Sequence, residues 1–76
     1  EFIHAVVLSE HAACMGSKIK DIDFAKMRVR VRGLRRNGTE VKDPDHEAVL
    51  QPHDVLVIAG KPRRVERAER KLLEGS

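Results

Sequence analysis

Five arginines lie close together in the middle of the chain, and their chemistry points to anions. They are Arg28, Arg30, Arg32, Arg35 and Arg36. A guanidinium group offers a planar fork of N–H donors, so an arginine cluster suits the phosphates of a nucleotide or a nucleic acid. Alternating charges are also typical of the solvated outer face of a sheet, which is the simpler interpretation for each arginine alone. Binding of single-stranded nucleic acid needs stacking aromatic side chains beside the charges, and none lie here, so we do not expect nucleic acid as a partner.

Residue types that bind metals or act as nucleophiles are present without a convincing pattern. His11-x-x-Cys14 has a plausible ligand spacing, but no second paired motif accompanies it, so we expect no metal. Cys14 has no nucleophile signature around it, and the aspartates are typical of caps and turns. The glycines form no phosphate-loop spacing. We therefore assign no catalytic residue, predict that the chain is not an enzyme, and expect no resident cofactor.

The arginines belong to a predicted β-hairpin. Met27, Val29 and Val31 alternate with three of them, a period of two that indicates a strand from Met27 to Leu34. Asn37-Gly38 predicts a type I′ turn, because both residues accept a positive φ, and the chain returns through residues 39–42. Leu34 breaks the alternation, which predicts a β-bulge near Gly33. We expect this hairpin to form the middle of the sheet.

The remaining elements follow from shorter patterns. An apolar run over residues 3–8 predicts a first strand, and Ser17 is placed to cap a short helix over residues 18–23. The near-continuous apolar run of residues 54–60 predicts a strand buried on both faces. Pro62 opens an amphipathic helix that Gly75 closes. The order β-α-β-β-β-α predicts an α+β fold with a small, mostly antiparallel sheet, a short helix after strand one and a C-terminal amphipathic helix.

Length and composition favour one domain, residues 1–76, with a partner. A chain of 76 residues buries only ~60% of its extended surface on folding. Domains of this size usually need further stabilisation by disulfides, a metal or a partner. The only cysteine, Cys14, excludes an internal disulfide, so association with another chain or domain is expected. The net charge of +3 is only modestly basic. No apolar run approaches the ~20 residues of a membrane span, and the start at Glu1 suggests a piece excised from a longer protein.

The order of elements and the residues within them resemble the TrkA-C, or RCK C-terminal, domain, and in particular the copy that ends bacterial Kef-type monovalent cation:proton antiporters. The matching stretches cover nearly the whole chain. They are Ile3-His4-Ala5-Val6-Val7-Leu8, His11-Ala12 with Gly16 and Lys18, Ile22-Asp23, Leu34-Arg35-Arg36, Val49-Leu50 with Asp54-Val55-Leu56-Val57, Gly60, and Ala68-Glu69 with Leu72-Leu73. Two positions depart from the family. His53 stands where relatives usually have glycine, and Arg32 where they more often have a small or uncharged residue.

The resemblance implies a cytoplasmic regulatory and dimerisation domain of a potassium or other monovalent cation transport system. Such a domain ends a membrane protein on the cytoplasmic side of the bacterial inner membrane, after a Rossmann-type domain and the antiporter domain of the same chain. It would pair as a homodimer and gate transport through a nucleotide ligand at the dimer interface, such as cyclic di-AMP, without inserting into the membrane itself. If it senses an anion, we expect Arg35, Arg36 and Asn37 at or beside the pocket. The alternatives are a purely structural dimerisation domain and a small basic nucleic-acid-binding domain.

Overall fold

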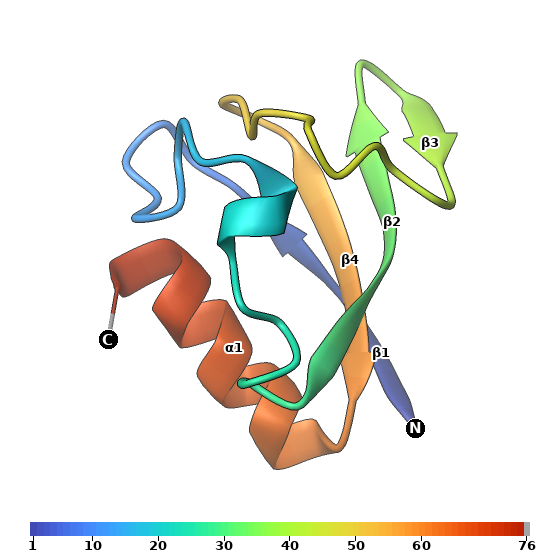
Figure 1. The fold of residues 1–76 in the computed structure, drawn as a ribbon, viewed down its shortest axis with the longest axis vertical. Helices are drawn as coiled ribbons and strands as arrows, with labels where there is room; N and C mark the ends of the chain where they lie inside the picture. Colours follow the sequence, from blue (N-terminus) through green and yellow to red (C-terminus); the bar gives the residue numbers. More distant parts are fainter. Residues whose placement is uncertain (76) are drawn as a thin grey trace.

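The computed structural model describes residues 1–75 and has an α+β fold, as the sequence predicts (Figure 1). Four strands precede one α-helix, with a single turn of 3-10 helix, η1, after the first strand. The elements in chain order are β1 (Phe2–Val7), η1 (Ile19–Asp21), β2 (Val29–Arg36), β3 (Thr39–Val41), β4 (Val55–Gly60) and α1 (Pro62–Glu74).

The four strands form one antiparallel sheet in the order β1-β4-β2-β3. The last strand of the chain, β4, therefore lies between the first two, pairing with β1 on one side and β2 on the other (Figure 1). The expectation that the whole hairpin forms the middle of the sheet is wrong, because only β2 is internal and β3 lies at the edge. A hairpin fixes only its own pairing, whereas the position of β4 depends on contacts distant in sequence.

The local features of the β2–β3 hairpin agree with the sequence. Asn37 and Gly38 have φ angles of 53° and 79°, the positive values that a type I′ turn requires. The register between β2 and β4 shifts between Val31 and Gly33, which confirms the predicted bulge. Gly33 is also needed for space, since a Cβ atom there would lie 3.2 Å from the carbonyl oxygen of Val41 on β3. The bulge lets Val31 and Leu34 face the same side of the sheet.

Two predicted element boundaries are wrong. The strand begins at Val29 instead of Met27, because Arg28 adopts a left-handed backbone with a φ of 61°. No α-helix spans residues 18–23; only η1 forms there, and the Ser17 side chain does not cap it. The backbone N–H groups of Ile19 and Lys20 donate to the carbonyl oxygens of Ala48 and His46, at 3.0 and 2.9 Å. The helical turn ends at Ile22, which has an extended backbone with φ −99° and ψ 122°.

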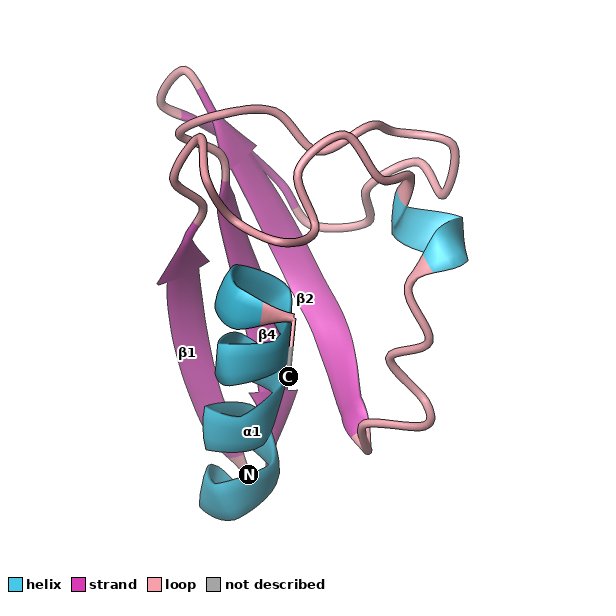
Figure 2. Ribbon diagram, turned by 90° about the vertical axis from the view of Figure 1, so that its left-hand side faces the viewer, coloured by secondary structure: helices cyan, strands magenta, loops and turns pink. Residues whose placement is uncertain are grey.

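Helix α1 covers one face of the sheet (Figure 2). Its apolar stripe is buried as predicted, and it packs on a core whose fully buried side chains include Leu56 and Ile58 of β4. The opposite face stays open, with Ile3 and Val7 of β1 54% and 63% exposed. Val55 and Val57 on that face are only partly buried, whereas Ala59 on the same face is buried, so the prediction of a strand buried on both faces is wrong for these two valines. No helix within residues 1–75 is long and apolar enough to span a bilayer.

Candidate functional site

The three residues predicted to lie at a ligand pocket occupy the end of β2 and the hairpin turn. Arg35 faces the open side of the sheet, where its Nε donates to Glu40 Oε1 of β3 at 2.8 Å. Arg36 faces the opposite side, as expected for successive residues of a strand. Asn37 provides the turn. At most one of the two arginines can therefore contact a given ligand directly, and both already have carboxylate partners in this structure.

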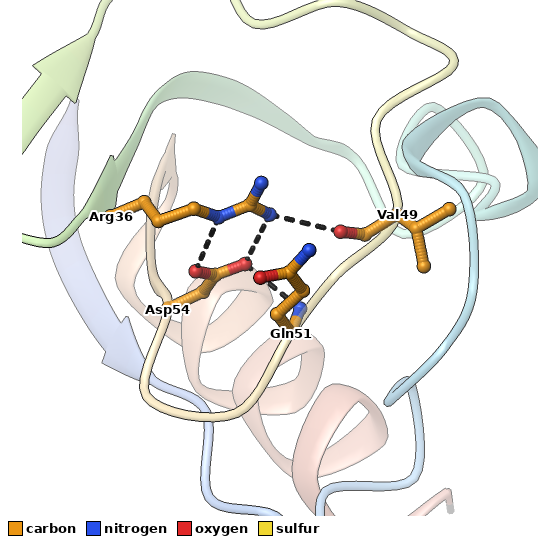
Figure 3. Close-up of polar contacts among 4 residues, drawn as sticks. All are labelled: Arg36, Val49, Gln51 and Asp54. Carbon is orange, nitrogen blue, oxygen red and sulfur yellow. Dashed lines mark hydrogen bonds and ion pairs between the residues drawn. The ribbon is translucent and has the colours of Figure 1, made fainter.

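Arg36 clamps three segments together (Figure 3). Its Nε donates to Asp54 Oδ1 at 2.9 Å, and its Nη2 donates to Asp54 Oδ2 at 2.7 Å. The same Nη2 also donates to the carbonyl oxygen of Val49 at 2.9 Å, and the backbone N–H of Gln51 donates to Asp54 Oδ2 at 2.9 Å. The clamp ties the end of β2 to the segment of residues 43–51, hereafter the strap, and to the turn that opens β4.

The local backbone explains how Asp54 reaches this position. His53 adopts a left-handed φ of 72°, a conformation that histidine tolerates better than most residues with a side chain. The turn directs the Asp54 side chain inward, where only 1% of the residue remains exposed. A buried carboxylate needs a charged partner and hydrogen-bond donors, and Arg36 and Gln51 supply them.

The electrostatics keep the clamp charged. Burial alone pushes the pKa of Asp54 upward, but hydrogen bonds from Arg36 and from the Gln51 backbone outweigh this effect, so the pKa lies below the ordinary aspartate value. The hydrogen bonds to Asp54 also raise the pKa of Arg36 above its ordinary value. Both groups are therefore ionised at neutral pH. Their bidentate ion pair has a structural role, because it links β2 to the turn before β4.

A hollow of about 650 Å³ lies on the same side of the molecule, and sequence reasoning missed it. Three parts of the chain form it: residues 19–25, the start of β2 and the strap. None of Arg35, Arg36 and Asn37 lines it. Its lining residues are Ile19, Lys20, Asp21, Ile22, Asp23, Phe24, Ala25, Val29, Arg30, Val31, Asp43, Pro44 and His46. We call this hollow the strap groove.

The lining of the strap groove combines apolar walls with charges of both signs. Phe24 is half-buried, while the cations Lys20 and Arg30 are exposed. Arg30 also donates to Glu1 Oε1 at 2.6 Å, so this arginine is held by an exposed ion pair that a stronger anion can displace. A sequence signal did exist, because Phe24 is one of only two aromatic side chains and lies outside the regular strands.

The other chemistry-bearing residues do not form a site. Cys14 is buried, and burial raises the pKa of its thiol above the ordinary value, which disfavours the reactive thiolate. His11 lies at the surface, 88% exposed, beside Glu10. Among the described residues 1–75, no group of three or more His, Cys, Asp or Glu side chains is placed to hold a metal ion.

One family model matches the chain, and solved structures share its fold. A family model described as the TrkA-C domain matches residues 3–73. No curated protein matches the chain significantly. The fold is similar to the RCK_C domain dimer of S. agalactiae BusR in complex with c-di-AMP, with a TM-score of 0.79 and 14% identity, covering 92% of this chain and 93% of that one.

Two further solved structures are similar at the same low identity. An RCK domain with cda gives a TM-score of 0.75 at 14% identity and covers 95% of this chain and 99% of that one. S. agalactiae BusR in complex with its busAB-promotor DNA gives a TM-score of 0.77 at 14% identity and covers 92% of this chain. The chain spans only 34% of that DNA-bound protein. At this identity the likeness establishes the fold alone.

Proposed function

The chain belongs to the TrkA-C family, and from this premise we propose that it is the cytoplasmic regulatory and dimerisation domain of a bacterial monovalent cation:proton antiport system. In this proposal residues 1–76 form one non-catalytic domain that follows a Rossmann-type domain and a membrane antiporter in the same chain. Two such domains pair, and a nucleotide bound between them shifts the conformational equilibrium that gates potassium or other cation transport. The related c-di-AMP-bound RCK_C dimer of BusR supports both the pairing and the ligand class.

The strap groove is the observation that carries the proposal, because its chemistry suits a nucleotide. Phe24 and Val31 are partly exposed and offer apolar surfaces for a base, and Arg30 offers a fixed charge for a phosphate. Aspartates at the rim, such as Asp43, can accept hydrogen bonds from hydroxyl or amino groups. The groove is open to one side, and we propose that the partner domain covers it.

The hairpin residues remain proposed contributors, with different roles. Arg36 holds the strap through Val49 and so positions Pro44 and His46, which line the groove. Arg35 and Asn37 are exposed and available to a ligand shared with a partner domain. Charge reversal separates these roles: in variants that remain folded and dimeric, Arg35→Glu and Arg36→Glu should weaken nucleotide binding unequally, one of them by more than ~2 kcal/mol.

Calorimetric titration with cyclic di-AMP tests the proposal. We expect saturable binding at one ligand per dimer. Arg30→Gln should weaken it about tenfold or more, because a charge-assisted phosphate contact is lost. Arg32→Gln is the matched control, since Arg32 contacts the same Glu1 carboxylate from the same strand but does not line the groove.

Three other outcomes would change the assignment. Absence of saturable binding by a folded dimer would favour a purely structural dimerisation domain. Equal loss of cyclic di-AMP affinity in Arg30→Gln and Arg32→Gln would place the ligand outside the strap groove. Binding of oligonucleotides that falls steeply with salt, without stoichiometric cyclic di-AMP binding, would favour the nucleic-acid alternative.

A further inference from the structure

Five cationic side chains share one side of α1. They are Arg63, Arg64, Arg67, Arg70 and Lys71. Successive residues of an α-helix are rotated by about 100°, so these five fall within an arc of roughly 120°. The buried residues Val65, Ala68 and Leu72 occupy the neighbouring arc that faces the core. The cations therefore form a stripe along the outer flank of the helix, and Glu74 enters the same arc only at its last turn.

Two adjacent hollows follow this stripe. One of about 340 Å³ lies between α1 and the residues before β2, and its lining is Lys26, Met27, Arg64, Arg67, Ala68, Arg70 and Lys71. The other, of about 510 Å³, lies at the start of the helix and is lined by Lys61, Pro62, Arg63, Arg64 and Arg67. No carboxylate lines either hollow. Arg64 and Arg67 border both, so one elongated ligand crossing these two side chains would reach both hollows.

These cations are largely without acidic partners, unlike the arginines of the sheet. On β2, Arg30, Arg32 and Arg35 each lie within 4.0 Å of a carboxylate. Among residues 1–75, only Arg70 of the helical stripe has an ion pair, at 3.6 Å from Glu66. Glu69 lies on the other flank of the helix and binds His4 instead. Unscreened like charges repel, so an anion placed here would relieve that repulsion.

We propose that α1 and Lys26 form a second anion site, for a soluble ligand that bears several linked phosphate groups. Arg64 and Lys71 are seven residues apart, about 10 Å along the helix axis, so the cations line a length that a chain of linked phosphates can follow. The guanidinium groups suit phosphate oxygens. The concave shape favours a soluble polyanion over a flat membrane surface. This site shares no lining residue with the strap groove and does not depend on the proposed function.

Titration calorimetry with inorganic tripolyphosphate as the probe tests this site, at moderate salt and with orthophosphate as a comparison. We expect saturable tripolyphosphate binding that orthophosphate does not match. The double variant Arg64→Gln/Arg67→Gln should raise the Kd about tenfold or more. The control, Arg32→Gln/Lys42→Gln, removes the same number of exposed charges away from both proposed sites and should leave the Kd unchanged. Circular dichroism confirms that both variants fold, and Arg67→Gln alone serves if the helix double variant does not.

Several results would overturn the proposal. If both double variants weaken tripolyphosphate binding equally, the effect comes from net charge and not from a site on α1. Binding to vesicles containing anionic phospholipid, without tripolyphosphate binding, would identify a membrane contact instead. Preference for an oligonucleotide over tripolyphosphate would indicate nucleic acid, and no binding by the folded wild-type chain would leave no site at all. Loss of tripolyphosphate binding with cyclic di-AMP binding intact would separate this site from the strap groove.

Discussion

The left-handed backbone at His53 costs free energy that glycine would not incur. A residue with a Cβ atom at φ 72° carries a steric penalty of roughly 1 kcal/mol, whereas glycine has none. We therefore expect His53→Gly to raise the free energy of unfolding by up to about 1 kcal/mol, as measured by urea denaturation. Arg28→Gly, at φ 61°, should act in the same direction. His46→Gly is the control without a positive φ, and a gain there of equal size would contradict the explanation.

The Arg36–Asp54 clamp predicts a sharp contrast between neighbouring arginines. Arg36→Ala leaves the buried Asp54 carboxylate without its charged partner, which should cost about 3 kcal/mol of unfolding free energy. Arg35→Ala removes only an exposed pair with Glu40 and should cost less than about 1 kcal/mol. Chemical denaturation of both variants measures the difference. Similar values would show that the clamp contributes no more than a surface ion pair.

The same carboxylate predicts how stability depends on pH. The pKa of Asp54 is lower in the folded chain than in the unfolded chain, so unfolding takes up a proton at acid pH. Its stabilisation is complete above the ordinary aspartate pKa of about 3.9 and is lost as the pH falls through the lower folded value. Denaturation curves from pH 7 to acid pH should show this loss, and Asp54→Asn should remove that part of it. Glu1→Gln is the control, because the carboxylate of Glu1 is exposed and should matter little. If the free energy of unfolding of Asp54→Asn falls at acid pH as much as that of the wild type, other carboxylates cause the loss.

Within β4, the two sides of the strand predict unequal sensitivity to charge. Leu56 lies fully buried under α1, so Leu56→Asp would bury an unpaired carboxylate and should prevent folding. Val57 lies on the open face and is only partly buried, so Val57→Asp should leave a folded chain of lower stability. Thermal melts followed by circular dichroism distinguish the two. A cooperative melt of Leu56→Asp would show that the core does not depend on this contact.

Patterns that act over a few residues were readable from the sequence. The Asn37-Gly38 turn, the bulge at Gly33 and the buried stripe of α1 each follow from neighbouring residues, and all three are present. The conformation after β1 was not readable, because the backbone there pairs with the strap, more than twenty residues away, through the N–H groups of Ile19 and Lys20. Ile22 is already extended, so the helical turn stops after three residues.

The candidate site was harder to predict than the fold, for the same reason. Arg36 was singled out for its charge, but its partner Asp54 is eighteen residues away and no spacing rule links the two. The strap groove joins three separate segments, so no single stretch of sequence predicts it. Whether Arg35, Arg36 and Asn37 contact a ligand stays a prediction.

The molecule as a whole has helix on one side of its sheet only, which favours a partner. Apolar side chains such as Ile3 and Val7 remain exposed on the other side, and a domain of 76 residues has a thin core. We expect a two-fold homodimer in sedimentation equilibrium at roughly tens of micromolar, with a melting temperature that rises with concentration. A monomer whose melting temperature does not depend on concentration would show that the small core is stable without a partner.

The position of β4 between β1 and β2 has a consequence for the order of events during synthesis. As the chain leaves the ribosome, the β2–β3 hairpin can close as soon as residue 41 emerges, because its pairing is local. Among the described residues 1–75, β4 is the only strand that pairs with β1, so β1 must wait until residues 55–60 appear. For that interval Phe2–Val7 is an apolar segment with unpaired backbone groups, open to chaperones or to the same segment of a neighbouring chain. Ribosome-stalled chains in which β4 has or has not left the exit tunnel should therefore differ abruptly in the protease resistance of Phe2–Val7.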